Sequence, residues 1–250
     1  MSRVSHPRQG PRRRRVRVTV AGAVLAVLVL AVAIAKGREP RPVPRPHAVA
    51  PLAPSPRPLT PATGAPAKRT AVPVRWRHSR PRGLPNAGRL LRGVQLPVEG
   101  RDYFTWDPVR RRVGNRGWRR WGTDGLVRVL LRVTEEYRRA HPEAPRVGIG
   151  DLSRPHGGSF GAQYGSLGHA SHQNGLDADV YYPRTDGKEL RPYKTALVDR
   201  RLAQDLVDRF RAAGAQVIFV GPNVGLHGPP SRVQKLVKHD DHLHVRLPRR

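Results

Sequence analysis

The sequence predicts an α+β fold for residues 76–250. Two amphipathic helical patterns and several short strand patterns follow one another there, without the regular alternation of a parallel α/β fold. A chain of 250 residues leaves room for one domain of ordinary size together with non-globular segments. We therefore expect one folded domain that begins near residues 76–85.

The elements of this domain follow from local patterns. Thr123-Asp124 supplies an N-cap for a helix that ends at His141-Pro142. A second helix is predicted over residues 198–213, where Gly214 stops it. Residues 146–152 and 216–220 are typical of short strands. The segment before the first helix predicts no clear element, and we expect its tryptophans in the core or in the wall of a substrate groove: Trp106, Trp118 and Trp121.

The N-terminal part of the chain is expected to lie outside the folded domain. Residues 1–17 are basic and predicted to be cytoplasmic, and residues 18–35 are apolar and just long enough to span a bilayer. This segment is either a transmembrane anchor, which its length favours, or a signal peptide cleaved after Ala33-Ile34-Ala35. Residues 36–75 form a Pro-rich linker. The domain would then be extracytoplasmic, in the cell envelope, and either membrane-anchored or secreted.

Charge and cysteine content restrict the partners and the ligands. The formal charge is +29, and residues 1–75 contribute +14 of it through 15 Lys and Arg against one acid, Glu39. Such a balance favours polyanionic surroundings, including anionic wall polymers, although Arg-rich usage also follows from a GC-rich genome. The basic residues are scattered and no nucleic-acid-binding motif appears, so we expect no nucleic-acid partner. The absence of Cys excludes disulfides and thiolate ligands, which leaves His, Asp and Glu to hold any metal.

Two short stretches are predicted to place metal-binding groups on neighbouring strands. In the first, Asn174-Gly175 forms a turn, and the alternation that follows puts Asp177 and Asp179 on the polar face of a half-buried strand. In the second, His242 and His244 share one face of a strand. A lone His-x-His is more often a surface feature, but two such strands side by side would bring His172, Asp179 and His244 together. Two His and one carboxylate leave an open coordination position, as in catalytic zinc sites.

Three blocks of the sequence closely resemble the penicillin-insensitive murein endopeptidases, which belong to the lysostaphin, D-Ala-D-Ala-peptidase and hedgehog-like metallopeptidase group. The blocks are residues 150–158, 168–179 and 239–246, in the order that the family has them. The resemblance implies a small antiparallel sheet with flanking helices that carries one zinc ion per chain. It also implies hydrolysis of the D-alanyl–diamino acid cross-link of peptidoglycan by metal-activated water, with stem peptides as the substrate.

The resemblance assigns roles to individual residues. The metal ligands would be His172, Asp179 and His244. The catalytic residues would be His242, beside the metal, together with His169, His239 and Asp241. Asp241 occupies the place of a general base, yet strand alternation puts it on the face opposite His244 unless the strand begins after it. His239 or His242 would otherwise take the proton.

Some features of the chain leave alternatives open. A D-Ala-D-Ala carboxypeptidase would use the same metal ligands, and a non-catalytic wall-binding module can keep the zinc fold. The chain lacks the cysteines expected of periplasmic members, and its N-terminal segment would tether it to the membrane. Residues 159–168 form a Gly-rich loop that is predicted to shape the substrate groove.

Overall fold

The computed structural model describes residues 73–161 and 169–249, and the described residues contain a sheet of seven strands. The basic N-terminus, the apolar segment 18–35, residues 36–72 of the linker and residues 162–168 of the Gly-rich loop lie outside the described residues. Within residues 73–161 and 169–249, no helix is long and apolar enough to cross a membrane.

The main sheet is mixed, which confirms the α+β class but corrects the expectation of a wholly antiparallel sheet. Its strand order is β10-β9-β11-β8-β7-β4-β5, and the pairs β4–β7 and β9–β10 are parallel. The helix α1 lies between β4 and β7 in the chain, and a helical crossover of this kind returns the second strand parallel to the first. The bounds are β4 Tyr103–Asp107, β5 Arg112–Val113, β7 Val147–Ile149, β8 Asp177–Tyr181, β9 Val217–Val220, β10 Val233–Lys235 and β11 His242–Arg246.

Both predicted helices are present. The helix α1 spans Asp124–Ala140, and the Thr123 side chain accepts a hydrogen bond from the Leu126 amide at 3.1 Å, which confirms the predicted cap. The helix α2 spans Arg200–Ala212 and begins two residues later than predicted, because Asp199 caps it. Gly214 follows with φ of +89°, as expected of a residue that ends a helix.

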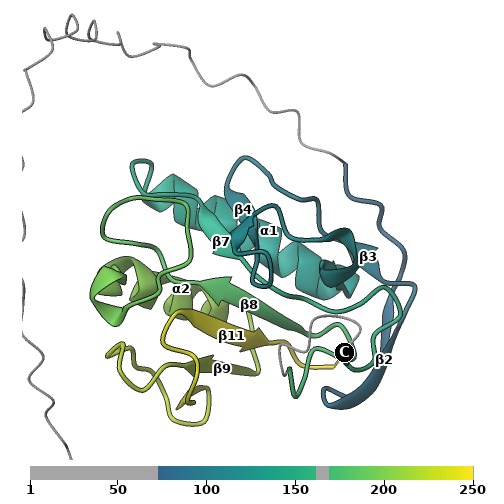
Figure 1. Cartoon of the computed structure of the whole chain (residues 1–250). Helices are drawn as coiled ribbons and strands as arrows, with labels where there is room; N and C mark the ends of the chain where they lie inside the picture. Colours follow the sequence, from purple (N-terminus) through teal and green to yellow (C-terminus); the bar gives the residue numbers. More distant parts are fainter. Residues whose placement is uncertain (1–72, 162–168, 250) are drawn as a thin grey trace, which may run out of the picture. The chain divides into compact units, whose positions relative to one another are not determined.

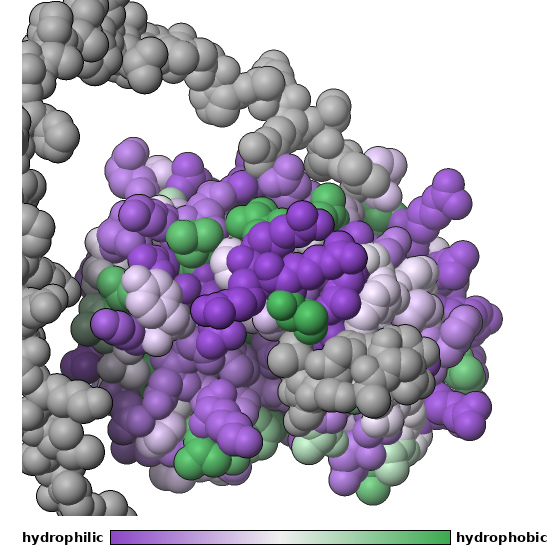
Figure 2. All heavy atoms as spheres, viewed as in Figure 1, coloured by the Kyte–Doolittle hydropathy of each residue, from purple (hydrophilic) through white to green (hydrophobic). Residues whose placement is uncertain are grey.

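The sheet has an apolar face under the helices and a polar face that carries the candidate site. One core cluster joins residues of both helices to the inward side chains of the central strands, among them Ala178, Val180, Leu243 and Val245. Figure 1 shows α1 and α2 behind the sheet, with β11 beside β8. Because side chains alternate along a strand, the intervening residues of β8 and β11 point away from the helices. Figure 2 shows the side of the domain seen in Figure 1 as largely hydrophilic, with separate small apolar patches.

The polar face of β8 is buried, in contrast to the half-buried strand that the alternation predicts. All five residues of β8 are buried, including Asp177 and Asp179. Aromatic side chains cover part of this face, since Tyr181 packs with Phe104 and Trp106 in a second apolar cluster. Alternation identifies which side chains share a face, but it does not reveal what covers that face.

The segment before α1 forms short elements that the sequence did not predict. A hairpin of β1 (Arg80–Leu84) and β2 (Ala87–Leu91) stands apart from the main sheet, and β3 (Val94–Gln95) pairs with β6 (Trp121–Gly122). A short 3-10 turn lies at Gly117–Arg119 in this segment, and another lies at Thr195–Leu197, before α2. Of the three tryptophans, Trp106 is buried, whereas Trp118 and Trp121 are half-buried.

Candidate metal centre

The predicted neighbouring strands are paired, and their register brings the candidate ligands together. Strands β8 and β11 are antiparallel, with His244 opposite Asp179 and His242 opposite Tyr181. His244 Nδ1 lies 3.3 Å from Asp179 Oδ1, and His242 Nε2 lies 3.6 Å from the same oxygen. Two adjacent strands thus direct two imidazoles toward one carboxylate.

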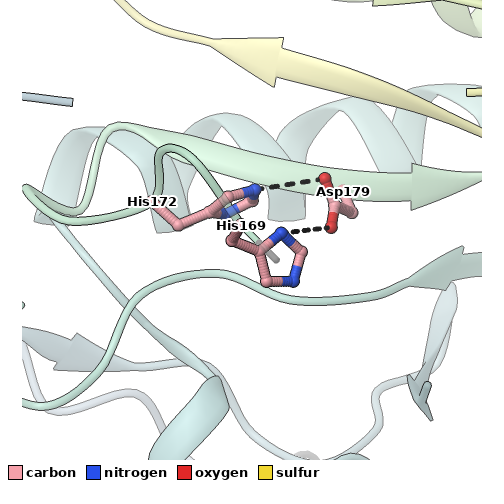
Figure 3. A group of neighbouring side chains, drawn as sticks. All are labelled: His169, His172 and Asp179. Atoms are coloured by element: carbon pink, nitrogen blue, oxygen red, sulfur yellow. Dashed lines mark ion pairs between the residues drawn. The ribbon is translucent and has the colours of Figure 1, made fainter. Parts of the chain in front are cut away.

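The loop before β8 supplies a third imidazole. His172 Nε2 lies 3.2 Å from Asp179 Oδ1, and Figure 3 shows the His172 side chain pointing from the loop toward Asp179. His172 has φ of +66°, a conformation that is unfavourable for a residue with a Cβ, and its amide donates to Asp177 Oδ2 at 3.1 Å. The turn that follows needs glycine, because Gly175 has φ of +76° and its missing Cβ would lie 2.7 Å from the Leu90 side chain.

These groups fit a metal ion. Asp179 Oδ1 and both ring nitrogens of His172 are buried and make no hydrogen bond within the described part of the chain. Such groups are costly to bury unless another ligand satisfies them. Nitrogen and oxygen ligands at about 2.0–2.2 Å from a tetrahedral zinc ion lie roughly 3.3–3.6 Å from one another. The distances of 3.2 and 3.3 Å from Asp179 Oδ1 to His172 and His244 are close to this spacing.

His169 and His244 are both placed to provide the remaining ligand. The side chains of His169, His172 and Asp179 offer ligand atoms that all lie within 4.8 Å of one another. Figure 3 shows His169 and His172 on the same side of Asp179. His169 Nδ1 is 3.9 Å from Asp179 Oδ2, whereas His244 Nδ1 is 3.3 Å from Asp179 Oδ1. The structure therefore brings together the predicted ligands, and His169 lies close enough to compete with His244.

Buried carboxylates orient both of these rings. His244 Nε2 bonds Asp177 Oδ1 at 3.0 Å, and Asp177 is also paired with Arg246 at 2.6 Å. His169 Nε2 bonds Asp151 Oδ2 at 2.7 Å. In each case the carboxylate accepts a hydrogen bond from Nε2–H of the ring, so Nδ1 can present its lone pair toward Asp179. This carboxylate–histidine arrangement is typical of residues that orient metal ligands.

A buried ion pair holds Asp151 in turn. Arg119 Nε donates to Asp151 Oδ1 at 2.6 Å, and Asn115 Nδ2 donates to the same oxygen at 3.0 Å. Neither Arg119 nor Asp151 is accessible at its side chain. Phe160 stacks edge-on against His169, with a distance of 5.2 Å between ring centroids. These contacts fix His169 even though the loop before it lies outside the described residues.

The electrostatics of the site favour proton uptake when no metal is bound. Burial disfavours the charged form of Asp179, but the imidazoles of His172 and His242 hold its pKa well below the usual range. Burial also opposes charge on His244, yet its hydrogen bond with Asp177 and the nearby carboxylate of Asp179 raise its pKa to about 9. Burial lowers the pKa of His172. A metal ion must therefore displace a proton from His244, which makes its affinity depend on pH.

The predicted catalytic residues lie around the same group. His242 Nδ1 bonds Asp241 Oδ1 at 2.7 Å, and Arg191 pairs with Asp241 Oδ2 at 2.6 Å. Strand β11 begins at His242, so Asp241 precedes the strand. Strand alternation therefore does not place Asp241 on the face opposite His244. His239 Nδ1 donates to the Val237 carbonyl at 2.9 Å, and its ring lies 4.7 Å from that of His242.

A cavity of about 560 Å³ opens over these residues. Its volume is in the range of small-ligand pockets. His169, His239, His242, His244 and Asp179 line it, and so do Phe219, Leu236, Val237 and the hairpin residues Pro85 and Asn86. The Asp241 carboxylate contacts the lining residue His242 from behind the cavity wall that these residues form.

Sequence reasoning missed the residues that support the site. Asp177 carried a signal, because alternation places it on the face of Asp179, but no role followed from that. Arg119 and Arg191 carried no sequence signal, because Asp151 and Asp241, the carboxylates with which they pair, lie far from them along the chain. Asp151 lies in the block of residues 150–158, but that block does not indicate which residues Asp151 contacts.

The chain is similar to proteins of a known family. The family described as penicillin-insensitive murein endopeptidase matches residues 82–217. That range includes His169, His172 and Asp179 and ends before β11.

Three relatives carry the same description. A protein of Yersinia enterocolitica is 33% identical over 94 residues, which cover 38% of this chain and 29% of the relative. Proteins of Salmonella heidelberg and Salmonella arizonae are 28% and 29% identical over 186 and 187 residues, in both cases 64% of this chain and 63% of the relative. The chain thus spans less than two thirds of the length of these relatives.

Proposed function

Because the chain belongs to the penicillin-insensitive murein endopeptidase family, we propose that it is a zinc-dependent endopeptidase that hydrolyses peptide cross-links of peptidoglycan. The bond cleaved would be that between D-alanine and a diamino acid, and the enzyme would act outside the cytoplasm. Three imidazole nitrogens around one buried oxygen of Asp179 support this most strongly, since they suit a metal ion at the floor of a cavity.

We assign the zinc ion to His172, Asp179 and His244. The shorter distance to the Asp179 carboxylate, 3.3 Å for His244 against 3.9 Å for His169, favours His244 as the ligand. Strand β11 also pairs with β8 on one side and with β9 on the other, which makes His244 rigid. A zinc ion in such a site lowers the pKa of a coordinated water to about 7 and polarises a scissile carbonyl. His169 would then stand beside the ion, held by Asp151.

The proton would move through His242. A carboxylate can only accept hydrogen bonds, so the bond with Asp241 fixes the proton of His242 on Nδ1. The neutral ring then offers the lone pair of Nε2 to the cavity, 3.6 Å from Asp179 Oδ1. His242 could take a proton from the attacking water and return it to the leaving amine. Asp241, already paired with Arg191, would orient this ring and would not act as the base.

The test is cleavage of a purified cross-linked muropeptide dimer, followed by mass spectrometry of the products. We expect two monomers, loss of activity with a chelator and recovery with zinc, and no activity in His172→Ala. Release of terminal D-alanine from an intact dimer would instead indicate a carboxypeptidase. A chain that binds zinc but leaves the dimer unchanged would refute the proposal.

A further inference from the structure

The β1–β2 hairpin has one face packed on the domain and one face open to solvent. Its register places Arg82 opposite Arg89, Arg80 opposite Leu91 and Leu84 opposite Ala87. Because paired residues share a face, these six side chains lie together, and all six are exposed. The opposite face includes Leu90, which is fully buried. The hairpin is therefore anchored on one face, and its other face has no partner among residues 73–161 and 169–249.

The open face is cationic without compensation. Arg80, Arg82 and Arg89 form no ion pair with any carboxylate in the described part of the chain. Like charges placed directly opposite one another across two strands are destabilising, as for Arg82 and Arg89. Several arginines elsewhere in the domain do have carboxylate partners, for example Arg116 with Asp107 and Arg146 with Glu189. These three arginines repel one another and have no carboxylate partner in the described part of the domain. Their arrangement therefore suits the binding of an anion from outside the domain.

The hairpin also borders the candidate site. Pro85 and Asn86, which connect β1 to β2, line the same cavity as His242 and His244. The Gln173 amide donates to the Pro85 carbonyl at 2.9 Å, which joins the hairpin to the loop that carries His172. A polymer with one peptide in the cavity would have its neighbouring groups beside the hairpin.

We propose that the exposed face of the β1–β2 hairpin docks the carboxylate-rich peptides of the polymer whose cross-link enters the cavity; this rests on the proposed function. Arginine binds carboxylates through two parallel hydrogen bonds, and three arginines on one face suit a multivalent acidic peptide. Leu84 and Leu91, which are 64% and 42% exposed, offer apolar contact next to these charges. Continuity with the cavity favours the substrate polymer itself over a phosphate-rich polymer or a lipid surface.

The test compares two triple variants of the full chain, both in a His242→Ala background so that bound polymer is not cut. The first is Arg80→Gln with Arg82→Gln and Arg89→Gln. The matched control is Arg110→Gln with Arg111→Gln and Arg112→Gln, which removes the same charge from exposed residues at the β5 edge of the sheet. Each is sedimented with peptidoglycan from which phosphate polymers have been stripped by acid.

We expect the hairpin variant to bind about tenfold more weakly, a difference of the size that loss of several charge contacts gives, and the control to bind within about twofold of the parent. Equal binding by the hairpin variant, or an equal loss in both variants, would overturn the inference. So would hairpin-dependent binding that occurs only to unstripped walls or to anionic lipid vesicles.

Catalysis separates this inference from the proposed function. With His242 intact, the hairpin variant should cleave a small soluble cross-linked dimer at the parental rate and intact peptidoglycan more slowly. Parental rates on both substrates would refute docking and leave the function standing. If the triple variant fails to fold, the single variant Arg82→Gln should still bind about twofold more weakly, and parental binding by it would count against docking.

Discussion

Asp177 offers the sharpest test of how the site is supported. Its carboxylate accepts three hydrogen bonds, from Arg246 at 2.6 Å, from His244 at 3.0 Å and from the His172 amide at 3.1 Å. Both proposed histidine ligands therefore depend on one buried acid. In Asp177→Asn, one carboxylate oxygen becomes an NH2 group. This group cannot accept a hydrogen bond, yet it must face at least one of the three donors.

The magnitude follows from these contacts. Breaking a buried ion pair costs about 3–5 kcal/mol. The Arg246 side chain is 21% exposed, so we expect the lower end of this range, about 3 kcal/mol. A domain stable by about 5–15 kcal/mol survives such a loss at moderate temperature. The misdirected His244 ring should in addition weaken zinc binding about 10- to 100-fold.

The assay has two parts. Denaturant unfolding of the metal-free protein reports the free energy of unfolding, and competition with a chelator reports zinc affinity. The control variant Asp186→Asn removes the pair with Arg184, away from the site, and should leave zinc affinity unchanged. If Asp177→Asn lost stability but kept zinc affinity within about twofold of wild type, Asp177 would not orient the ligands and the reasoning would be refuted.

Three further predictions follow. His242→Ala should keep its zinc and its melting temperature but lose about 100- to 1000-fold in turnover of a cross-linked dimer; zinc loss would make His242 a ligand. For the metal-free protein, the raised pKa of His244, about 9, contributes stability below pH 6.5 that is lost as the pH rises to 9, and the lowered pKa values of Asp177 and Asp151 contribute stability that is lost as the pH falls below 3.8. Denaturant unfolding should therefore show stability that falls between pH 6.5 and 9 and falls again below pH 3.8, and a flat profile would contradict the assigned contacts. A reporter fused after residue 75 should be active only outside the cytoplasm, and activity inside would contradict the expected topology.

The sequence predicted the parts of the site that depend on strand alternation. Residues of β8 and β11 that alternate with apolar positions do share one face, and the register places His244 opposite Asp179. Both helices were predicted because apolar spacing and caps are local signals.

The remainder depends on contacts between distant parts of the chain. Neither the pairing of Arg119 with Asp151 nor that of Arg191 with Asp241 leaves a local pattern. The burial of β8 and the parallel pair β4–β7 depend on how separate elements pack, and the hairpin before α1 contains glycine and proline, which weaken any strand pattern.

Zinc content of single variants tests the central claim most directly, because the structure places two histidines where a third ligand is needed. Purified wild-type protein should hold about one zinc per chain, as expected for a three-ligand site. We predict that His172→Ala, Asp179→Ala and His244→Ala lose the metal, while His169→Ala retains it. Retention of zinc in His244→Ala together with its loss in His169→Ala would contradict the assignment and place the ion between His169, His172 and Asp179.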